Sequence, residues 1–201
     1  MYWCKLSLIG LMIFGVVSSA VPQDAIDDRG EGTVNHNYFA AASNKALSDL
    51  VRNIEMNHID RCPHNSFQAG VMHDIAQGKY QYAKDDLIYM LERFVNHPRA
   101  LQIGIMVSTM SKDRAWLLDR FEYALRWYPN YAITHAQYGS YLTEIGSVPQ
   151  GIERLQKAIS MDPKLVAGHV WLSKAYAKQG NAEAAREAAN KAKELGYKGT
   201  L

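Results

Sequence analysis

The most constraining feature of this 201-residue chain is a period of 34 residues in its C-terminal two thirds. Residues of one kind recur at this interval, among them Pro129 and Pro163, Gly146 and Gly180, and His135 and His169. One register places them all and divides the chain into residues 64–97, 98–131, 132–165 and 166–199. A period of this length is typical of an array in which each repeat buries its core against its neighbours.

The columns of this register predict two helices in each repeat. Counted from the first residue of a repeat, position 15 should end the first helix in a left-handed conformation, which glycine adopts at least cost. That position is occupied by Gly78, Lys112, Gly146 and Gly180. Positions 8 and 20 should be small where the helices cross, as Gly139 and Gly151 are in the third repeat. We therefore expect helix turns at the three glycines and no strand.

These columns resemble the tetratricopeptide repeat over residues 64–199, most clearly in "YGSYLTEIGSVPQGIERLQKAISMDP" and "WLSKAYAKQGNAEAAREAANKAKELG". The resemblance implies an all-α fold, a right-handed α-solenoid of about four helix-turn-helix repeats. The stretch "GKYQYAKDDLIYMLERFVNHPRAL" is also similar to small exported repeat proteins of proteobacteria. Such arrays usually bind protein partners in a concave groove lined by the first helices.

The first twenty residues read as a secretory signal. Lys5 precedes an uncharged apolar run, Leu6 to Val17, and Ser18-Ser19-Ala20 offers small residues for cleavage. The run is shorter than the roughly 20 residues that span a bilayer. We expect export to the bacterial envelope, with cleavage after Ala20 and no membrane span in the mature chain. The alternative interpretation is an uncleaved N-terminal tether.

Two segments separate this signal from the repeats. Residues 21–42 mix acidic residues and glycines without periodicity, which predicts a flexible segment with nothing to bury. Residues 43–63 hold an N-terminal helix, which we expect over 43–57 with Ser43 or Asn44 as its cap.

A partner-binding groove is predicted from positions 2, 5, 9 and 12 of the first helices. The residues of this predicted groove are Gln68, Met72, Arg99, Gln102, Met106, Thr109, Ser140 and Lys174. Its N-terminal part is polar with two methionines, whose flexible side chains adapt to apolar segments of a partner. An open alternative is that Met72 and Met106 fill space between neighbouring helices.

A rival function is the binding of copper or zinc. His58, Cys62 and His64 are competent ligand types within seven residues of one another. Their spacing matches no closed structural zinc pattern, and Pro63 interrupts the segment. We expect no metal and no other cofactor, and keep this cluster as the alternative.

Charge and motifs argue against other function classes. A formal net charge of +2 gives no footprint for nucleic acid. We find no phosphate-cradling glycine loop, nucleophile elbow or zinc-protease motif, so we expect no enzymatic activity. The sequence therefore predicts a scaffold for protein–protein interaction, as an accessory or assembly factor of an envelope complex.

Overall fold

The structure is a computed structural model that describes residues 35–59 and 70–201. Within these residues all regular structure is helical, and the one extended contact there is an isolated bridge between His36 and Phe94. The all-α prediction is confirmed. The predicted signal at residues 1–20, Cys62 and His64 lie outside the described residues.

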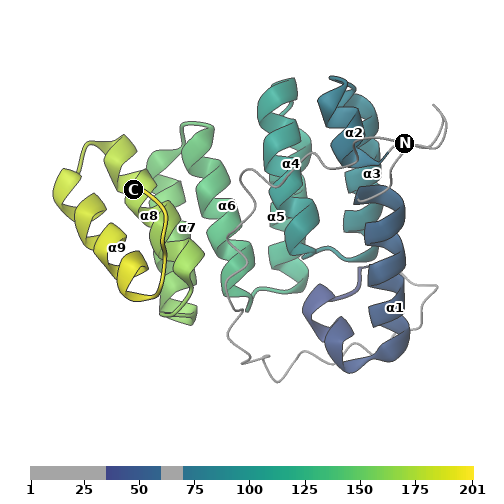
Figure 1. Cartoon of the computed structure of the whole chain (residues 1–201), viewed down its shortest axis with the longest axis horizontal. Coiled ribbons are helices and arrows are strands. Elements are labelled where there is room, and N and C mark those ends of the chain that lie inside the picture. The colour runs from purple at the N-terminus through teal and green to yellow at the C-terminus, as the bar shows by residue number, and fades with distance from the viewer. Residues whose placement is uncertain (1–34, 60–69) are drawn as a thin grey trace. The chain divides into compact units, whose positions relative to one another are not determined.

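The described residues form two compact units, divided after Pro129 (Figure 1). Helices of the first unit are η1 (Tyr38–Ser43, a 3-10 helix), α1 (Lys45–Ile54), η2 (Glu55–Ile59, a π-helix), α2 (Val71–Ala76), α3 (Tyr80–Arg93), α4 (Pro98–Ser111) and α5 (Ala115–Trp127). Helices of the second unit are α6 (Ala132–Glu144), α7 (Val148–Met161), α8 (Val166–Gln179) and α9 (Ala182–Glu194).

Each unit is built from helical hairpins. In the second unit α6 pairs with α7 and α8 with α9, while α6 and α7 also pack against α8. In the first unit α2 pairs with α3 and α4 with α5, and α3 packs against α4. Helices α4, α6 and α8 begin at Pro98, Ala132 and Val166, which are the first residues of the predicted repeats.

The turns inside the hairpins depend on left-handed residues. Gly78, Gly146 and Gly180 have φ values of +69°, +99° and +86°, as the glycine column predicts. In the second repeat Lys112 adopts the same conformation, with φ of +60°, although it carries a side chain. The Lys84 ammonium, 2.6 Å from a carboxylate oxygen of Asp113, helps to fix this turn from α3.

Close approach of the backbones explains the small residues at the helix crossings. A Cβ on Gly139 would lie 2.7 Å from the Gly151 carbonyl oxygen and 2.7 Å from Leu155 Cγ. Such distances are well inside van der Waals contact, so glycine is required where α6 crosses α7. In the last hairpin the Ser173 hydroxyl donates to the Ala185 carbonyl oxygen at 2.8 Å, which joins α8 to α9.

In the second repeat, different side chains pack where α4 crosses α5. Leu117 occupies position 20, where the other repeats carry alanine or glycine. A Cβ on Gly104 would lie 2.9 Å from Leu117 Cδ1 and 3.2 Å from Trp116 Cη2. Gly104, at position 7 of this repeat, therefore makes room for these two larger side chains.

Each unit has its own apolar core. In the second unit the core joins all four helices and is made of small and aliphatic side chains: Ala136, Ile152, Leu155, Ala158, Leu172, Ala175 and Ala188. In the first unit Leu87, Leu117 and Phe121 are fully buried. Burying apolar side chains of this size stabilises each unit by about 1.5–3 kcal/mol per side chain.

The expected flexible segment, residues 21–42, needs correction over its last residues. His36 and Asn37 are 0% and 1% exposed, and η1 follows them directly. The His36 amide donates to the Arg93 carbonyl oxygen at 2.7 Å, and Asn96 Nδ2 donates to Asn37 Oδ1 at 2.8 Å. Hydrogen bonds to the α3–α4 turn thus hold this segment in place, although its sequence has no apolar pattern. Residues 21–34 lie outside the described residues.

Helix α1 lies within the segment predicted to hold an N-terminal helix, residues 43–63, of which 60–63 lie outside the described residues. Asn44 is its cap, with Oδ1 accepting from the Leu47 amide at 3.2 Å, and the helix continues through η2 to Ile59. Among residues 35–59 and 70–201, no helix is both long enough and apolar enough to cross a membrane.

Candidate functional site

The structure places all of the predicted groove residues except Gln68, which lies outside the described part of the chain. In the first unit Met72 lies on α2, and Arg99, Gln102, Met106 and Thr109 lie on α4. In the second unit Ser140 lies on α6 and Lys174 on α8.

The two methionines of the predicted groove are accessible. Met72 is 44% exposed, and Met106 is half-buried on α4 beside the half-buried Gln102. Side chains that only filled a gap between helices would be buried, so their exposure favours the surface interpretation. The binding role itself stays a prediction.

Thr109 is exposed at the far end of this face. Its hydroxyl donates to the Ile105 carbonyl oxygen at 2.8 Å, within α4. The hydroxyl hydrogen is therefore used inside the helix, and the oxygen stays available to accept a hydrogen bond from a ligand.

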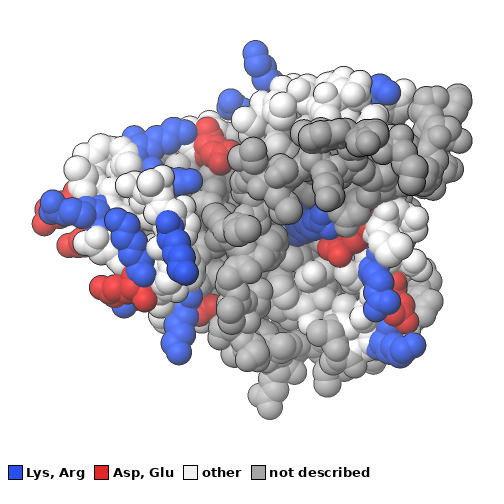
Figure 2. Space-filling view, in the orientation of Figure 1, with Lys and Arg blue, Asp and Glu red and all other residues white. Residues whose placement is uncertain are grey.

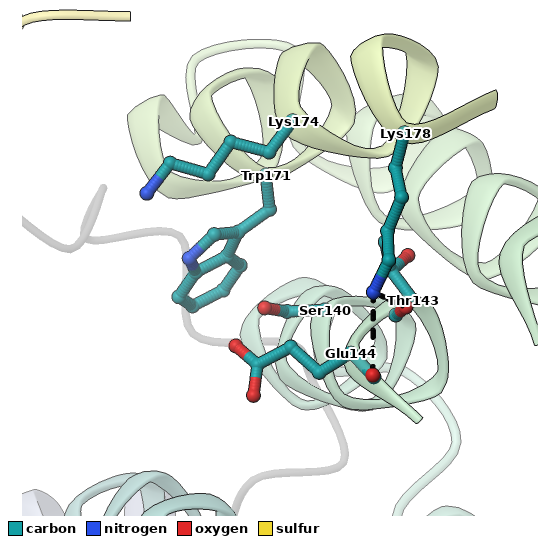
Figure 3. Close-up of a pocket in the computed structure, with 6 residues that line it drawn as sticks. All are labelled: Ser140, Thr143, Glu144, Trp171, Lys174 and Lys178. Carbon is teal, nitrogen blue, oxygen red and sulfur yellow. Dashed lines mark hydrogen bonds between the residues drawn. The ribbon is translucent and has the colours of Figure 1, made fainter. Parts of the chain in front are cut away.

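In the second unit, Ser140 and Lys174 line one pocket between α6 and α8. The pocket encloses about 150 Å³, which is less than the several hundred Å³ typical of cofactor and small-molecule sites. This space suits a side chain of a bound segment. The lining residues are Ser140, Thr143, Glu144, Trp171, Lys174 and Lys178 (Figure 3).

Lys178 is fixed at the edge of this pocket. Its ammonium donates to the Thr143 carbonyl oxygen at 2.8 Å and to the Glu144 carbonyl oxygen at 3.3 Å (Figure 3). These carbonyls belong to the last turn of α6, where no amide of the helix can reach them. A cation there also favours the negative end of the helix dipole. Lys178 therefore joins α8 to α6 and keeps its charge beside the pocket.

Glu144 is the one acidic side chain in the pocket lining. The pKa of its carboxyl is raised, because partial burial against the pocket disfavours the charged form. The ammonium groups of Lys178 and Lys174 act in the opposite direction and lower this pKa by less. The pocket thus combines two cations with a carboxylate that takes up a proton more readily than usual.

Sequence reasoning missed half of the pocket. Trp171 is at position 6 of its repeat, and Glu144 and Lys178 are at position 13 of theirs. Positions 2, 6, 9 and 13 also form one stripe of a helix, rotated slightly from the 2, 5, 9 and 12 that we used. The sequence did contain a signal for these residues. Trp171, Glu144 and Lys178 each follow by one residue a position that was assigned to the groove, and α6 and α8 carry few other charges.

The prediction that position 5 lines the groove is wrong in the second unit. Ala136 and Val170 occupy it and are both 0% exposed. They pack in the core because small apolar side chains there let the helices approach. Position 5 therefore does not face a ligand on α6 or α8.

The histidine and cysteine cluster has one described member. His58 Nδ1 lies 3.0 Å from Asp86 Oδ1, and its ring packs on Tyr89 with centroids 4.7 Å apart. Among the described residues, no group of three or more histidine, cysteine, aspartate or glutamate side chains could hold a metal. Cys62 and His64 lie outside those residues, and nothing in the structure favours the metal alternative.

His135 and His169, which share a column, are buried at 5% and 8% exposure. His169 Nε2 lies 3.0 Å from the Pro163 carbonyl oxygen, a partner in the preceding turn. Both histidines therefore fill interhelical space rather than face solvent.

The hairpins identify the architecture. Antiparallel helices of 13 or 14 residues, joined by a left-handed residue, start at Pro98, Ala132 and Val166. The fold is tetratricopeptide-like. No protein-family model matches the sequence, and no curated protein matches it.

Solved structures are similar to the tetratricopeptide-like chain at low identity. One is MamA 41-end from Desulfovibrio magneticus RS-1, 20% identical, with 78% of this chain and 83% of that chain covered and a TM-score of 0.49. Another is YrrB, titled a TPR protein with an unusual peptide-binding site, 16% identical, with 78% and 76% covered and a TM-score of 0.48.

Proposed function

We propose that this chain is an exported scaffold that binds a partner protein through the first helices of its repeats, as an accessory or assembly factor of a complex in the bacterial envelope. The observation that carries the proposal is the pocket between the first helices α6 and α8. In the first unit, the accessible Met72 and Met106 on α2 and α4 support binding through its own first helices. Flexible methionine side chains suit a surface that adapts to a partner.

Export is supported by the sequence of the first twenty residues alone. A reporter enzyme that is active only outside the cytoplasm, fused after residue 34, should be active. Deleting Leu6 to Val17 should abolish that activity, because the apolar run is what an export machinery would recognise. An active reporter after the deletion would contradict export by this segment.

Binding through the first helices is tested by photo-crosslinking in living cells. A photoreactive amino acid at Met106 or Lys174 should form a covalent adduct with one partner, whereas the same amino acid at Glu122 or Lys157 should not. Glu122 and Lys157 are exposed on the second helices α5 and α7, so they control for accessibility. Adducts from the second-helix positions alone would refute the proposed face.

Substitution of the methionines is the complementary test. Replacing Met72 and Met106 by glutamate should remove the adduct that forms at Lys174, because charge at an apolar contact is costly to desolvate. Helicity and the melting temperature should stay nearly unchanged, since neither side chain is in the buried core. If the variants melt instead, the two methionines support the fold and not the partner.

A further inference from the structure

Charges are distributed unevenly between the helices of the second unit. The first helices α6 and α8 carry only Glu144, Lys174 and Lys178, and all three line the pocket. The second helices α7 and α9 carry both signs in mixture, with Glu153, Arg154 and Lys157 on α7 and Glu183, Arg186, Glu187, Lys191, Lys193 and Glu194 on α9. The first-helix face that holds the pocket is therefore net positive, whereas basic and acidic side chains both lie on this end of the chain in the view of Figure 2.

The two lysines of this face, Lys174 and Lys178, differ in the contacts of their ammonium groups. Lys178 is held by two carbonyl oxygens of α6, so its charge has a fixed place. Lys174 is exposed, and no carboxylate of the described residues forms an ion pair with its ammonium. Lys174 thus presents an ammonium that an incoming carboxylate could pair with at little cost, because an exposed lysine gives up few contacts.

Trp171 supplies the apolar wall of the same pocket. It is half-buried on α8 and its ring stands beside the Lys174 side chain, facing Ser140 and Glu144 of α6 (Figure 3). An indole combines a large apolar face with one N–H donor, which makes tryptophan a frequent anchor in protein interfaces. The Ser140 hydroxyl adds a further donor at the floor.

We infer that this pocket docks an acidic segment of the partner protein, with one aspartate or glutamate side chain beside Lys174 and Lys178 and a neighbouring apolar side chain on Trp171. The inference rests on the proposed function and names the chemistry of the partner. About 150 Å³ of space accommodates one side chain and leaves the rest of the segment outside. Glu144 opposes the incoming carboxylate, and its raised pKa lets it accept a proton and so reduce the repulsion.

The inference is tested with two fluorescent peptides of equal length, one alternating glutamate and leucine and one alternating lysine and leucine. Binding to the full chain is followed by fluorescence anisotropy at low salt. The acidic peptide should bind and the basic peptide should not. Lys174→Glu should weaken the acidic peptide by about tenfold or more, as expected for reversing a charge in an interface. Lys174→Arg should bind within about threefold of the parent, because the charge is kept.

Lys157→Glu is the matched control. It changes the net charge of the chain by the same amount but lies on α7, away from the pocket. It should alter binding by less than about twofold, since exposed charges at a distance are screened. Glu144→Gln should tighten the acidic peptide several-fold, because it removes the opposing carboxylate.

Three results with bound peptide would overturn the inference. They are unchanged binding in Lys174→Glu, equal weakening in Lys157→Glu, and preferential binding of the basic peptide, which would mean that Glu144 and Trp171 select a cation. If the peptides fail while the first-helix crosslinks persist, the acidic chemistry is wrong and the scaffold function stands. If the crosslinks fail as well, both proposals fall.

Discussion

Single glycines and their neighbours decide how each hairpin closes. Gly139 and Gly151 let α6 and α7 touch through their backbones, whereas Gly104 yields its space to Leu117. The glycine column at the turns was readable from the sequence because it recurs every 34 residues. The contact between Gly104 and Leu117 could not be predicted from the sequence. Leu117 is larger than the residues of the other repeats at its position, and only the structure shows that it lies against Gly104.

Gly139 provides a stability test at this scale. Gly139→Leu should lower the free energy of unfolding by about 1–3 kcal/mol or more, because any side chain there meets the Gly151 carbonyl oxygen and Leu155. Urea unfolding followed by circular dichroism measures the change.

Ala177→Leu on α8 is the control for this substitution. Ala177 is exposed, so the same larger side chain should change stability by less than about 0.5 kcal/mol. A Gly139→Leu protein as stable as the parent would show that the crossing of α6 and α7 can widen freely.

At the scale of elements, the helices of the repeats follow from sequence and the segment at residues 35–43 does not. The helices have an apolar period that the 34-residue register reinforces. The segment is instead held by polar groups: the Tyr38 amide donates to Asn96 Oδ1 at 2.8 Å, and the Tyr128 hydroxyl donates to the Asn35 carbonyl oxygen at 2.7 Å. Hydrogen bonds of this kind leave no periodic pattern in a sequence.

Likewise, half of the pocket residues were not predicted, because positions 5 and 12 of the first helices were assigned to the groove instead of positions 6 and 13. The repeat register located Ser140 and Lys174 correctly on first helices. The rotation of those helices, which brings Trp171 and Lys178 to the pocket, depends on how deeply Ala136 and Val170 pack. Packing depth is a property of the assembled unit and not of the local sequence.

A substitution at Asn96 tests whether its hydrogen bonds hold residues 35–43 in place. Asn96→Ala removes its bonds to the Tyr38 amide and to Asn37 Oδ1, and should cost about 1–3 kcal/mol because the first bond is partly buried and the second is buried. Hydrogen exchange resolved by peptide should rise in residues 35–43 first. Asn190→Ala, at an exposed position of α9, should leave exchange unchanged. Unaltered protection of 35–43 in Asn96→Ala would contradict this account.

At the scale of the whole molecule, the buried His97 of the first unit and Glu144 of the second should change stability in acid with opposite signs. His97 is fully buried, and its Nδ1 accepts from the Ala100 amide at 3.3 Å as the cap of α4. Its Nε2 faces Glu55 Oε1 at 3.3 Å, and the Tyr38 ring packs on it at 4.5 Å. Burial, with a smaller effect of Arg99, lowers the pKa of His97 to about 3.

The sign of the acid effect follows from this lowered pKa. Below the unfolded value of about 6.5 the unfolded chain binds a proton that the folded unit rejects, so stability falls as the pH falls. The loss is about 1.4 kcal/mol per pH unit between about 6.5 and 3, or about 2 kcal/mol at pH 5. Glu144 in the second unit has a raised pKa, so protonation in acid favours its folded form.

Unfolding in urea at pH 7.5 and pH 5, read by hydrogen exchange, checks this prediction. The first unit should lose stability and the second should not. His97→Asn keeps an oxygen that caps α4 but does not titrate, so it should remove most of the pH dependence of the first unit. An equal pH dependence in His97→Asn would assign the effect to other groups.

The bonds of Asn35 and His36 also determine how the first unit would carry mechanical load. A pull on the chain ahead of Asn35 is borne first by the Asn35 and His36 amides, which bond to the Glu92 and Arg93 carbonyl oxygens at 2.8 and 2.7 Å. Tension therefore passes directly into the last turn of α3, and through the Tyr128 hydroxyl to the residue that ends α5. Helix α1 lies beyond this point along the chain and would be shielded from the force until those bonds break.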